Sequence, residues 1–265
     1  MNDQANNFTD NSFNLHQAYS YALLLQVELN TFGYAFVNYD RLLVSALNCD
    51  LDELAHPKQL SEILTATYKK VTIGLPATAL TLVPKTLFRA DRINDVARLL
   101  DVKVTDKVFA QVLDDENYIV YKTPAYIASA VEKFGFNNTV YTAKGWLKAI
   151  LKTRPSADNL YLDFGRGQLH IAYFSGQIIR FYNIFEFKNE EDVVYYATLV
   201  CEELKLKPPH TTLVLSGDVI PDDKYMKRLE DFFPKIELNS IRVLNLPGQI
   251  PQHKVLSLVA LSLCE

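Results

Sequence analysis

Apolar residues recur at strand spacing near the start of this chain. Three short apolar runs, separated by turn-forming Asn, Asp and Gly residues, predict an antiparallel meander of three strands at residues 22–29, 34–37 and 41–47. Residues 57–66 then carry apolar side chains at helical spacing, and residues 70–75 predict a strand that ends at Pro76. The predicted order of this segment is βββαβ.

The rest of the first half alternates between helical and strand patterns. It predicts a helix at 89–100, a hairpin of strands 107–113 and 117–121, a helix at 124–134, a strand at 138–142 and a helix at 144–152. A segment rich in Pro, Ser, Asp and Asn at 152–159 is typical of a linker.

The pattern after this linker repeats the opening one. It predicts strands at 159–164, 168–174, 177–187 and 211–215 and a helix at 190–204, again in the order βββαβ. A shift of 137 residues places Gln26 on Asp163 and Ala35 on Ala172, and a larger shift of 143 places Gly74 on Gly217. Two unrelated meanders that match by chance are the alternative, but a duplication explains the repeat better.

We therefore expect an α/β protein made of two duplicated βββαβ subdomains. Residues 1–17, rich in Asn, are expected to form a disordered leader, residues 18–154 an N-terminal subdomain and residues 155–265 a C-terminal one. The last segments predict a helix at 222–232, a strand or a pair of short strands at 235–243 and a helix at 253–264. That terminal helix is apolar almost all round, so we expect it to be buried against the sheet of the second half.

Composition narrows the functional classes. Of 265 residues, 49% are hydrophobic and 22% are charged, as in an ordinary globular chain. A net charge of -4 argues against nucleic acid or an anionic membrane as the partner, because both attract a surplus of Lys and Arg. Three widely spaced cysteines indicate no disulfide framework, and no apolar stretch is long enough to span a membrane. A cytoplasmic location follows as the expectation.

Several common catalytic motifs are absent from the sequence. It has no GxxxxGK phosphate loop, no HExxH and no GxSxG, and its five histidines are isolated from one another. The triplet Asp163-Phe-Gly165 matches the magnesium-binding triplet of protein kinases, but no HRD loop or glycine-rich hairpin accompanies it. His170 is expected to be a packed or surface residue.

One candidate site remains, at the end of the first strand after the linker. Asp163 closes an apolar strand, and Gly165-Arg166-Gly167 follow at once as a tight turn, whose backbone N–H groups can meet a phosphate while the carboxylate holds a metal ion. Gly217 and Asp218 follow another strand, where a glycine permits close approach of a nucleotide. Alternatively, Asp163 only caps its turn by accepting backbone N–H bonds. Both interpretations stay open.

These elements resemble motifs of the actin-like ATPase superfamily, which has a ribonuclease H-like fold. Asp163 to Gly167 is similar to its second phosphate hairpin, and Val214-Leu-Ser-Gly217 to its adenosine segment. More narrowly, four motifs resemble the uncharacterised domain-of-unknown-function family 3822 (DUF3822): Tyr161-Leu-Asp-Phe-Gly165, Phe181-Tyr-Asn-Ile-Phe185, Leu215-Ser-Gly-Asp218 and Leu261-Ser-Leu-Cys-Glu265. The resemblance implies an actin-like ATPase fold for the folded chain, with ATP and magnesium as the possible ligands, and no established activity.

The sequence also departs from the superfamily. Its first phosphate hairpin begins Asp-x-Gly, whereas the stretch here is Leu25-Gln-Val-Glu-Leu-Asn30, with no glycine before Gly33. Glu28 is the substitute carboxylate that this stretch offers. Arg166 replaces a small residue of the second hairpin, although its guanidinium can still pair with a phosphate. Asp218 replaces a second glycine and adds a negative charge.

These departures predict a catalytically silent, pseudo-ATPase binding or scaffolding module with at most weak nucleotide binding and no catalytic residue. Loss of one preorganised electrostatic group commonly lowers a rate by about 10²–10³. The chain has fifteen Tyr and fifteen Phe, and Tyr is favoured at protein interfaces. This aromatic content indicates another protein as the partner. The alternative is a Mg-ATP-dependent ATPase or phosphotransferase that uses Asp163 and Glu28 toward the metal and Arg166 on a phosphate.

Overall fold

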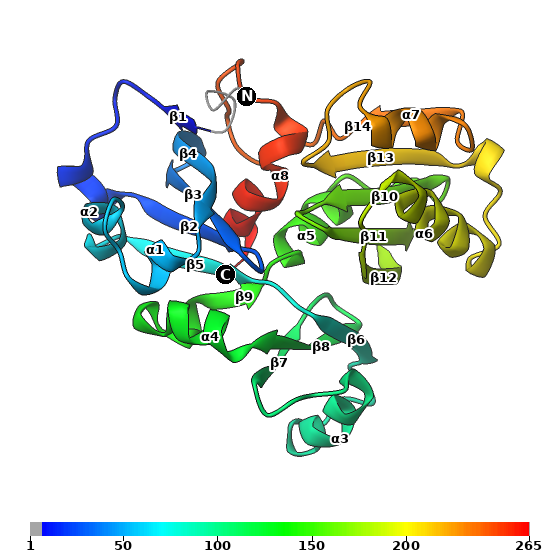
Figure 1. Cartoon of the computed structure of the whole chain (residues 1–265), viewed down its shortest axis with the longest axis horizontal. Helices are drawn as coiled ribbons and strands as arrows, with labels where there is room; N and C mark the ends of the chain where they lie inside the picture. The colour runs from blue at the N-terminus through cyan, green and yellow to red at the C-terminus, as the bar shows by residue number, and fades with distance from the viewer. Residues whose placement is uncertain (1–6, 265) are drawn as a thin grey trace. The chain divides into compact units, whose positions relative to one another are not determined.

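The computed structural model describes residues 7–264 (Figure 1). They fall into two compact units: the first holds the chain up to residue 146 with 242–250 and 257 onward, and the second holds 147–241 and 251–256. The strands and helices of the first unit are β1 (Asn7–Thr9), β2 (Ala22–Val27), β3 (Thr31–Asn38), β4 (Arg41–Asp50), α1 (Asp52–Ala55), α2 (Ser61–Thr65), β5 (Lys70–Leu75), β6 (Ala79–Pro84), α3 (Ile93–Ala97), β7 (Asp106–Val112), β8 (Asn117–Pro124), α4 (Ala125–Val131) and β9 (Thr139–Tyr141).

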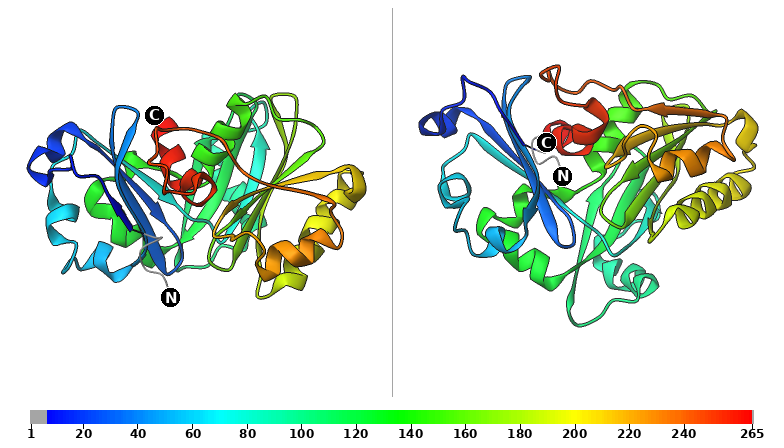
Figure 2. Two further views of the ribbon diagram at one scale, coloured as in Figure 1. Left: turned by 90° about the horizontal axis from the view of Figure 1, so that it is seen from above. Right: turned by 45° about the horizontal axis from the view of Figure 1, so that its top comes forward.

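The remaining strands and helices belong mostly to the second unit. They are α5 (Lys144–Lys152), β10 (Asn159–Phe164), β11 (Gln168–Ser175), β12 (Ile178–Glu186), α6 (Glu190–Glu203), β13 (Thr212–Gly217), α7 (Lys224–Glu230), β14 (Lys235–Leu238) and α8 (Gln252–Ala260). Figure 2 shows the same elements from two further directions. Within residues 7–264, no helix has the length and apolar character that crossing a membrane requires.

The first unit is built on a mixed sheet with the order β1-β4-β3-β2-β5-β9. β2 runs antiparallel to β3 and parallel to β5, and β5 runs parallel to β9. Leu23, Leu24 and Leu25 of β2 are fully buried, as a strand in the middle of a sheet with both faces covered requires.

A second sheet, β6-β8-β7, is inserted between β5 and β9. The sequence predicts the β7–β8 hairpin, and the structure confirms it. β6 was not predicted, because its side chains are half-buried and alternate weakly between apolar and polar. Lys122 and Asp106 form a buried ion pair in this sheet, 3.1 Å apart, and the Lys122 ammonium also donates to the carbonyl of Asp101.

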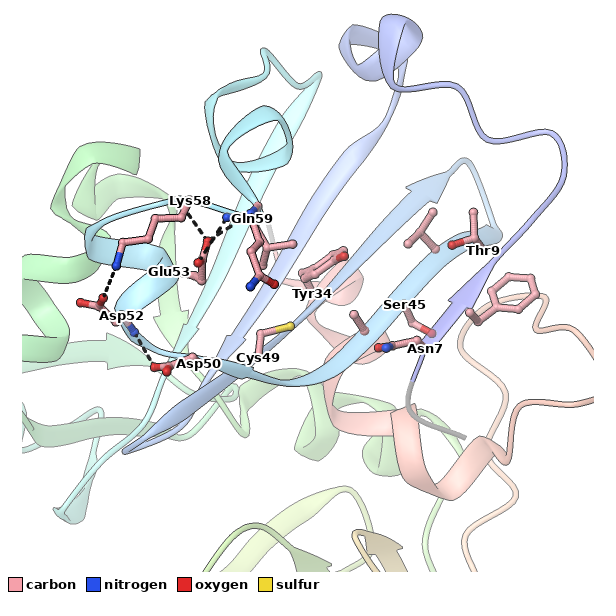
Figure 3. Close-up of a pocket in the computed structure, with 14 residues that line it drawn as sticks. Asn7, Thr9, Tyr34, Ser45, Cys49, Asp50, Asp52, Glu53, Lys58 and Gln59 are labelled. Carbon is pink, nitrogen blue, oxygen red and sulfur yellow. Dashed lines mark hydrogen bonds and ion pairs between the residues drawn. The ribbon is translucent and has the colours of Figure 1, made fainter. Parts of the chain in front are cut away.

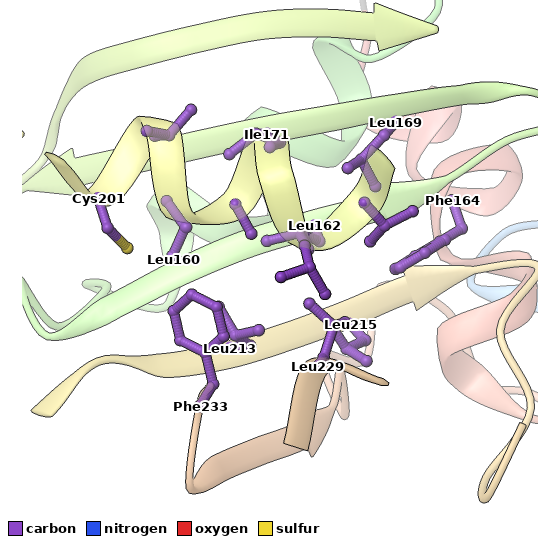
Figure 4. Close-up of a cluster of buried hydrophobic side chains, with 14 of the residues drawn as sticks. Leu160, Leu162, Phe164, Leu169, Ile171, Cys201, Leu213, Leu215, Leu229 and Phe233 are labelled. Carbon is purple, nitrogen blue, oxygen red and sulfur yellow. The ribbon is translucent and has the colours of Figure 1, made fainter. Parts of the chain in front are cut away.

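The second unit has a five-stranded sheet in the order β12-β11-β10-β13-β14. One face carries leucines of β10 and β13 that pack against Val193 and Ala197 of α6 and Leu229 of α7 (Figure 4). A capping box starts α6: the Asn189 side chain accepts from the Asp192 N–H, and the Asp192 carboxylate accepts from the Asn189 N–H. The sequence pattern predicts every strand of this sheet and both of its helices, so the local pattern agrees with the packing of the second unit.

Apart from the additional strand β1, the two sheets share one topology, which confirms the predicted duplication. Adding 137 to each residue of a β2–β3 pair gives a β10–β11 pair: Gln26 opposite Gly33 becomes Asp163 opposite His170. A register irregularity after Phe36 recurs after Tyr173, at the same shift. The predicted shift of 143 for the next strand is off by one, because Gly74 lies beside Gln26 whereas the residue beside Asp163 is Ser216.

The expected disordered leader is wrong for residues 7–17; residues 1–6 lie outside the described part. Asn7–Thr9 forms β1, which pairs with β4, and a 3-10 helix covers Leu15–Ser20. The Phe13 ring stacks on Phe36 with centroids 5.0 Å apart, and Asp10 pairs with Arg41. These partners lie far away in the sequence, so the polar composition of the segment does not reveal them.

The terminal helix differs from expectation in what its last turns contact. Leu258 and Leu261 lie over Gly33 of β3 and Gly74 of β5, where an added Cβ would come within 3.7 and 3.1 Å of them. Lys70 donates to the Cys264 carbonyl. This end therefore packs on the first sheet, which provides glycines that leave room for it, and the expected burial against the second sheet is wrong here.

Candidate functional site

The β10–β11 turn holds the glycines that the sequence singled out. The Gly165 N–H donates to the carbonyl of Gln168 at 2.8 Å, and Gly167 has a φ of +75°, a left-handed conformation that favours glycine. The Gly167 carbonyl accepts from Phe187 N–H at 3.1 Å. Arg166 and Gly167 are exposed at the tip. The structure thus brings Asp163, Gly165, Arg166 and Gly167 together on one hairpin.

Asp163 is buried one residue before the end of β10. Its neighbours across the sheet are His170 in β11 and Ser216 in β13, and directly paired residues place their side chains on the same sheet face. This is the face opposite to the leucines that contact α6. The strand therefore directs the carboxylate away from the hydrophobic core of the unit, into a group of buried polar side chains.

His170 is isolated from the other histidines of the sequence, and in the structure it lies beside Asp163. Its Nδ1 is 2.7 Å from the Tyr182 hydroxyl, and burial lowers its pKa to about 4, so the imidazole is neutral near pH 7. The sequence contained the signal: a hairpin turning at Gly165–Gly167 pairs position 163 with position 170. No histidine motif reveals this contact, because it depends on the register of the hairpin and not on a fixed pattern of residue types.

Gly217 is constrained by the neighbouring strand. Its φ is +83°, and a Cβ there would collide with the carbonyl oxygen of Phe164 and lie 2.8 Å from an oxygen of the Asp163 carboxylate. The next residue, Asp218, donates its N–H to the same Phe164 carbonyl at 2.8 Å and is exposed. Close packing of β13 on β10 therefore accounts for the glycine without a ligand.

Glu28 belongs to the first unit, at the β2–β3 turn that corresponds to the β10–β11 turn. Its N–H donates to the carbonyl of Thr31 at 2.9 Å, which matches the Gly165–Gln168 bond, and its carboxylate accepts from the Thr31 hydroxyl at 2.9 Å. Tyr126 donates to the Leu29 carbonyl at 2.9 Å. With the shift of 137, Glu28-Leu29-Asn30 occupies the place of Gly165-Arg166-Gly167.

A pocket of about 630 Å³ lies elsewhere on the first unit, between β1, β3, β4 and the α1 region (Figure 3). None of the residues predicted for the nucleotide site lines it. Burial, with the negative charge of Glu53, raises the pKa of the Cys49 thiol to about 11, so this thiol is a poor nucleophile. The Glu53 carboxylate accepts the N–H groups of Lys58 and Leu60, which holds the loop after α1.

The structure therefore places the predicted residues in two turns and one strand end. A metal ion at Asp163 remains a prediction: within residues 7–264, no group of three or more His, Cys, Asp or Glu side chains is arranged to hold a metal ion. The turn at Gly165–Gly167 has glycine at two of its three positions, whereas the turn at Glu28 carries a side chain at each position.

Solved structures share this architecture at low sequence identity. A protein of unknown function with an actin-like ATPase fold from Bacteroides thetaiotaomicron VPI-5482 has a TM-score of 0.79 at 15% identity, covering 96% of this chain and 99% of that one. The type IV pilus biogenesis complex PilM–PilN gives 0.62 at 12%, covering 91% and 97%. The ethanolamine utilization protein EutJ from Carboxydothermus hydrogenoformans gives 0.52 at 9%, covering 96% and 92%.

These likenesses confirm the expected actin-like ATPase fold. A search of curated proteins found no match. The sequence model of a protein family of unknown function, DUF3822, matches residues 10–236, which confirms the narrower resemblance. This chain, a two-unit protein with the actin-like ATPase fold, is a member of the DUF3822 family.

Proposed function

We propose that this chain is a catalytically silent actin-like protein that acts by binding another protein. The β2–β3 turn carries this proposal. An actin-like ATPase presents a glycine-containing turn to the phosphates from each half, and here the turn of the first unit has Glu28, Leu29 and Asn30 instead. The Glu28 N–H donates within its turn as the Gly165 N–H does in the second turn, so the side chains, and not this hydrogen bond, distinguish the first turn.

The energetic consequence is a loss of transition-state stabilisation. Each missing electrostatic group costs about 10²–10³ in rate, and the first turn lacks both the glycine and the Asp of the superfamily pattern. Glu28 does not replace that Asp in our interpretation, because its carboxylate accepts from the Thr31 hydroxyl and thereby closes the turn. Useful ATP hydrolysis is not expected.

Exposed apolar side chains support the second half of the proposal. Among the described residues, Leu87, Leu99, Val102, Val104 and Val112 are exposed, and all belong to the segment inserted between β5 and β9. A contiguous patch of exposed apolar groups marks a protein-docking surface, and our proposal is that these side chains contribute to one. A structurally similar solved structure is the PilM–PilN type IV pilus biogenesis complex, a precedent for this fold in protein assembly. The three free cysteines suit a reducing, cytoplasmic setting.

The alternative of a Mg-ATP-dependent ATPase or phosphotransferase is favoured by one observation. The β10–β11 turn keeps two glycines, with Arg166 exposed at its tip beside the strand that carries Asp163. Such a turn suits a phosphate. We therefore retain weak nucleotide binding as part of the proposal, with Asp163, Gly165, Arg166, Gly167, Gly217 and Asp218 as the residues concerned.

Thermal unfolding with Mg-ATP separates the two functions. A ligand at ~100 times its dissociation constant adds ~2.7 kcal/mol to the free energy of unfolding. In a chain of this size, each 1 kcal/mol raises Tm by about 2–4 °C. We expect little or no rise at millimolar Mg-ATP and no phosphate release. A rise of several degrees that Asp163→Ala abolishes, together with phosphate release, would establish the enzyme instead.

Affinity purification with matched surface variants tests the partner. The wild-type chain, the double variant Leu99→Glu and Val104→Glu, and the control Ile220→Glu, which alters an exposed apolar residue of the second unit, serve as baits. We expect a protein that the wild type and the control retain and the double variant loses. Identical recovery with all three baits, or no recovery above an unrelated bait, would contradict docking at this segment.

A further inference from the structure

The two copies of the repeated fold differ at their outer strand. In the first unit, β4 would form the edge of the sheet, but β1 pairs with it through Asn7–Thr9. The corresponding strand of the second unit is β12, which lies outermost in its sheet and pairs only with β11 among the described strands (Figure 1). An edge strand offers a row of backbone donors and acceptors to another strand.

The backbone groups that β12 offers follow from its pairing. Ile184 lies opposite His170 in β11, yet its N–H donates to the side-chain oxygen of Asn183 at 2.9 Å and so points away from β11. In an antiparallel ladder, the N–H and C=O of one residue point the same way and alternate along the strand. Tyr182 and Glu186 therefore share the outward direction of Ile184.

β12 has a charged residue three positions from Asn183 and a phenylalanine two positions from it on each side. The sequence Arg180-Phe-Tyr-Asn-Ile-Phe-Glu186 has a basic residue at one end and an acidic residue at the other, with a phenylalanine inside each. Arg180 and Glu186 are also the two exposed residues of the strand, and within residues 7–264 neither forms an ion pair. Exposed charges of opposite sign thus lie three residues from the centre, one at each end of the strand.

We infer that β12 pairs antiparallel with β12 of a second copy of this chain, about a two-fold axis at Asn183. In this register Phe181 faces Phe185 of the second copy and Tyr182 faces Ile184. Arg180 is the extra residue of a β-bulge in β12 and reaches Glu186 of the second copy through its long side chain. Opposite charges and aromatic pairs at directly opposed positions stabilise a sheet. A two-fold axis uses each of these contacts twice, and it joins the two five-stranded sheets into one.

The backbone geometry fits the same register. Tyr182 and Ile184 both direct N–H and C=O outward, so each pair exchanges two hydrogen bonds, while Asn183 sits at a non-hydrogen-bonded position where side chains approach closely. In the monomer, the Asn183 amide oxygen takes the place of the second strand by accepting the Ile184 N–H. Pairing releases this amide to meet its symmetry-related counterpart.

A charge-reversal cycle measured by analytical ultracentrifugation tests the interface. We expect the purified chain to form dimers in a concentration-dependent way. Arg180→Glu or Glu186→Arg alone removes two ion pairs and weakens dimerisation by about five- to thirtyfold. The double variant Arg180→Glu with Glu186→Arg restores it, because the reversed charges again face each other. Lys235→Glu, on β14 at the other edge of the same sheet, is the matched control and leaves dimerisation unchanged.

A backbone variant provides an independent readout. Ile184→Pro removes an N–H that no neighbouring strand accepts, so the fold tolerates it as an edge strand tolerates proline, while the dimer loses two interchain bonds. Circular dichroism confirms that the variant is folded. A chain that stays monomeric at millimolar concentration, or a dimer insensitive to both single reversals, would overturn the inference. The measurement needs no nucleotide and no other protein, so its outcome is separate from that of the proposed function.

Discussion

Gly217→Ala distinguishes a packing role for this glycine from a ligand-binding one. The substitution places a methyl group against the Phe164 carbonyl and the Asp163 carboxylate. It also puts alanine at a position whose φ is +83°. The left-handed conformation costs a non-glycine residue about 1–2 kcal/mol, and overpacking costs about 1–3 kcal/mol more. The expected loss in the free energy of unfolding is therefore about 2–5 kcal/mol.

Gly176→Ala is the matched control for this experiment. Gly176 also has a left-handed φ, +63°, but an added Cβ meets no atom within 4 Å. Only the conformational cost of about 1–2 kcal/mol applies to it. The difference between the two variants thus isolates the steric contact with β10.

Urea unfolding followed by fluorescence of Trp146, the single tryptophan and fully buried, measures both variants. We expect Gly217→Ala to unfold at a clearly lower urea concentration than Gly176→Ala. If the two variants are equally stable, the packing of β13 on β10 does not explain Gly217, and close approach of a ligand becomes the better explanation.

Three further predictions concern other parts of the fold. Lys122→Met leaves the Asp106 carboxylate buried without its ammonium partner and is expected to lower stability by about 3 kcal/mol in urea unfolding; a loss below about 1 kcal/mol would contradict a buried pair. His170 has a native pKa near 4 and about 6.5 when unfolded, so only the unfolded state binds its proton between these values. Its contribution is complete above pH 6.5 and is lost as pH falls toward 4, at up to ~1.4 kcal/mol per pH unit, and His170→Gln should flatten the dependence of stability on pH in this window. An unchanged slope would mean that the imidazole is accessible to protons. Asn189→Ala removes the cap of α6 and should cost about 1 kcal/mol, with the Asp192 N–H left without its side-chain acceptor; equal thermal stability of variant and wild type would refute the cap.

The sequence alone determined the repeated strand meander, because alternation and turn residues act locally. The β2–β3 and β10–β11 hairpins, the Gly165–Gly167 turn and α6 were all predicted from residues close together in the chain. The sequence also showed that the β2–β3 turn departs from the superfamily pattern, because this departure lies in the residue types themselves.

Only the tertiary structure decided the features that depend on residues far apart. β1 exists because β4 offers it an edge, and the end of α8 packs on the first sheet because Gly33 and Gly74 leave room for its leucines. The neighbourhood of Asp163 and the burial of His170 likewise arise from strand pairing. Pairing and burial join positions that a local pattern cannot connect, which is why these contacts appear only in the folded chain.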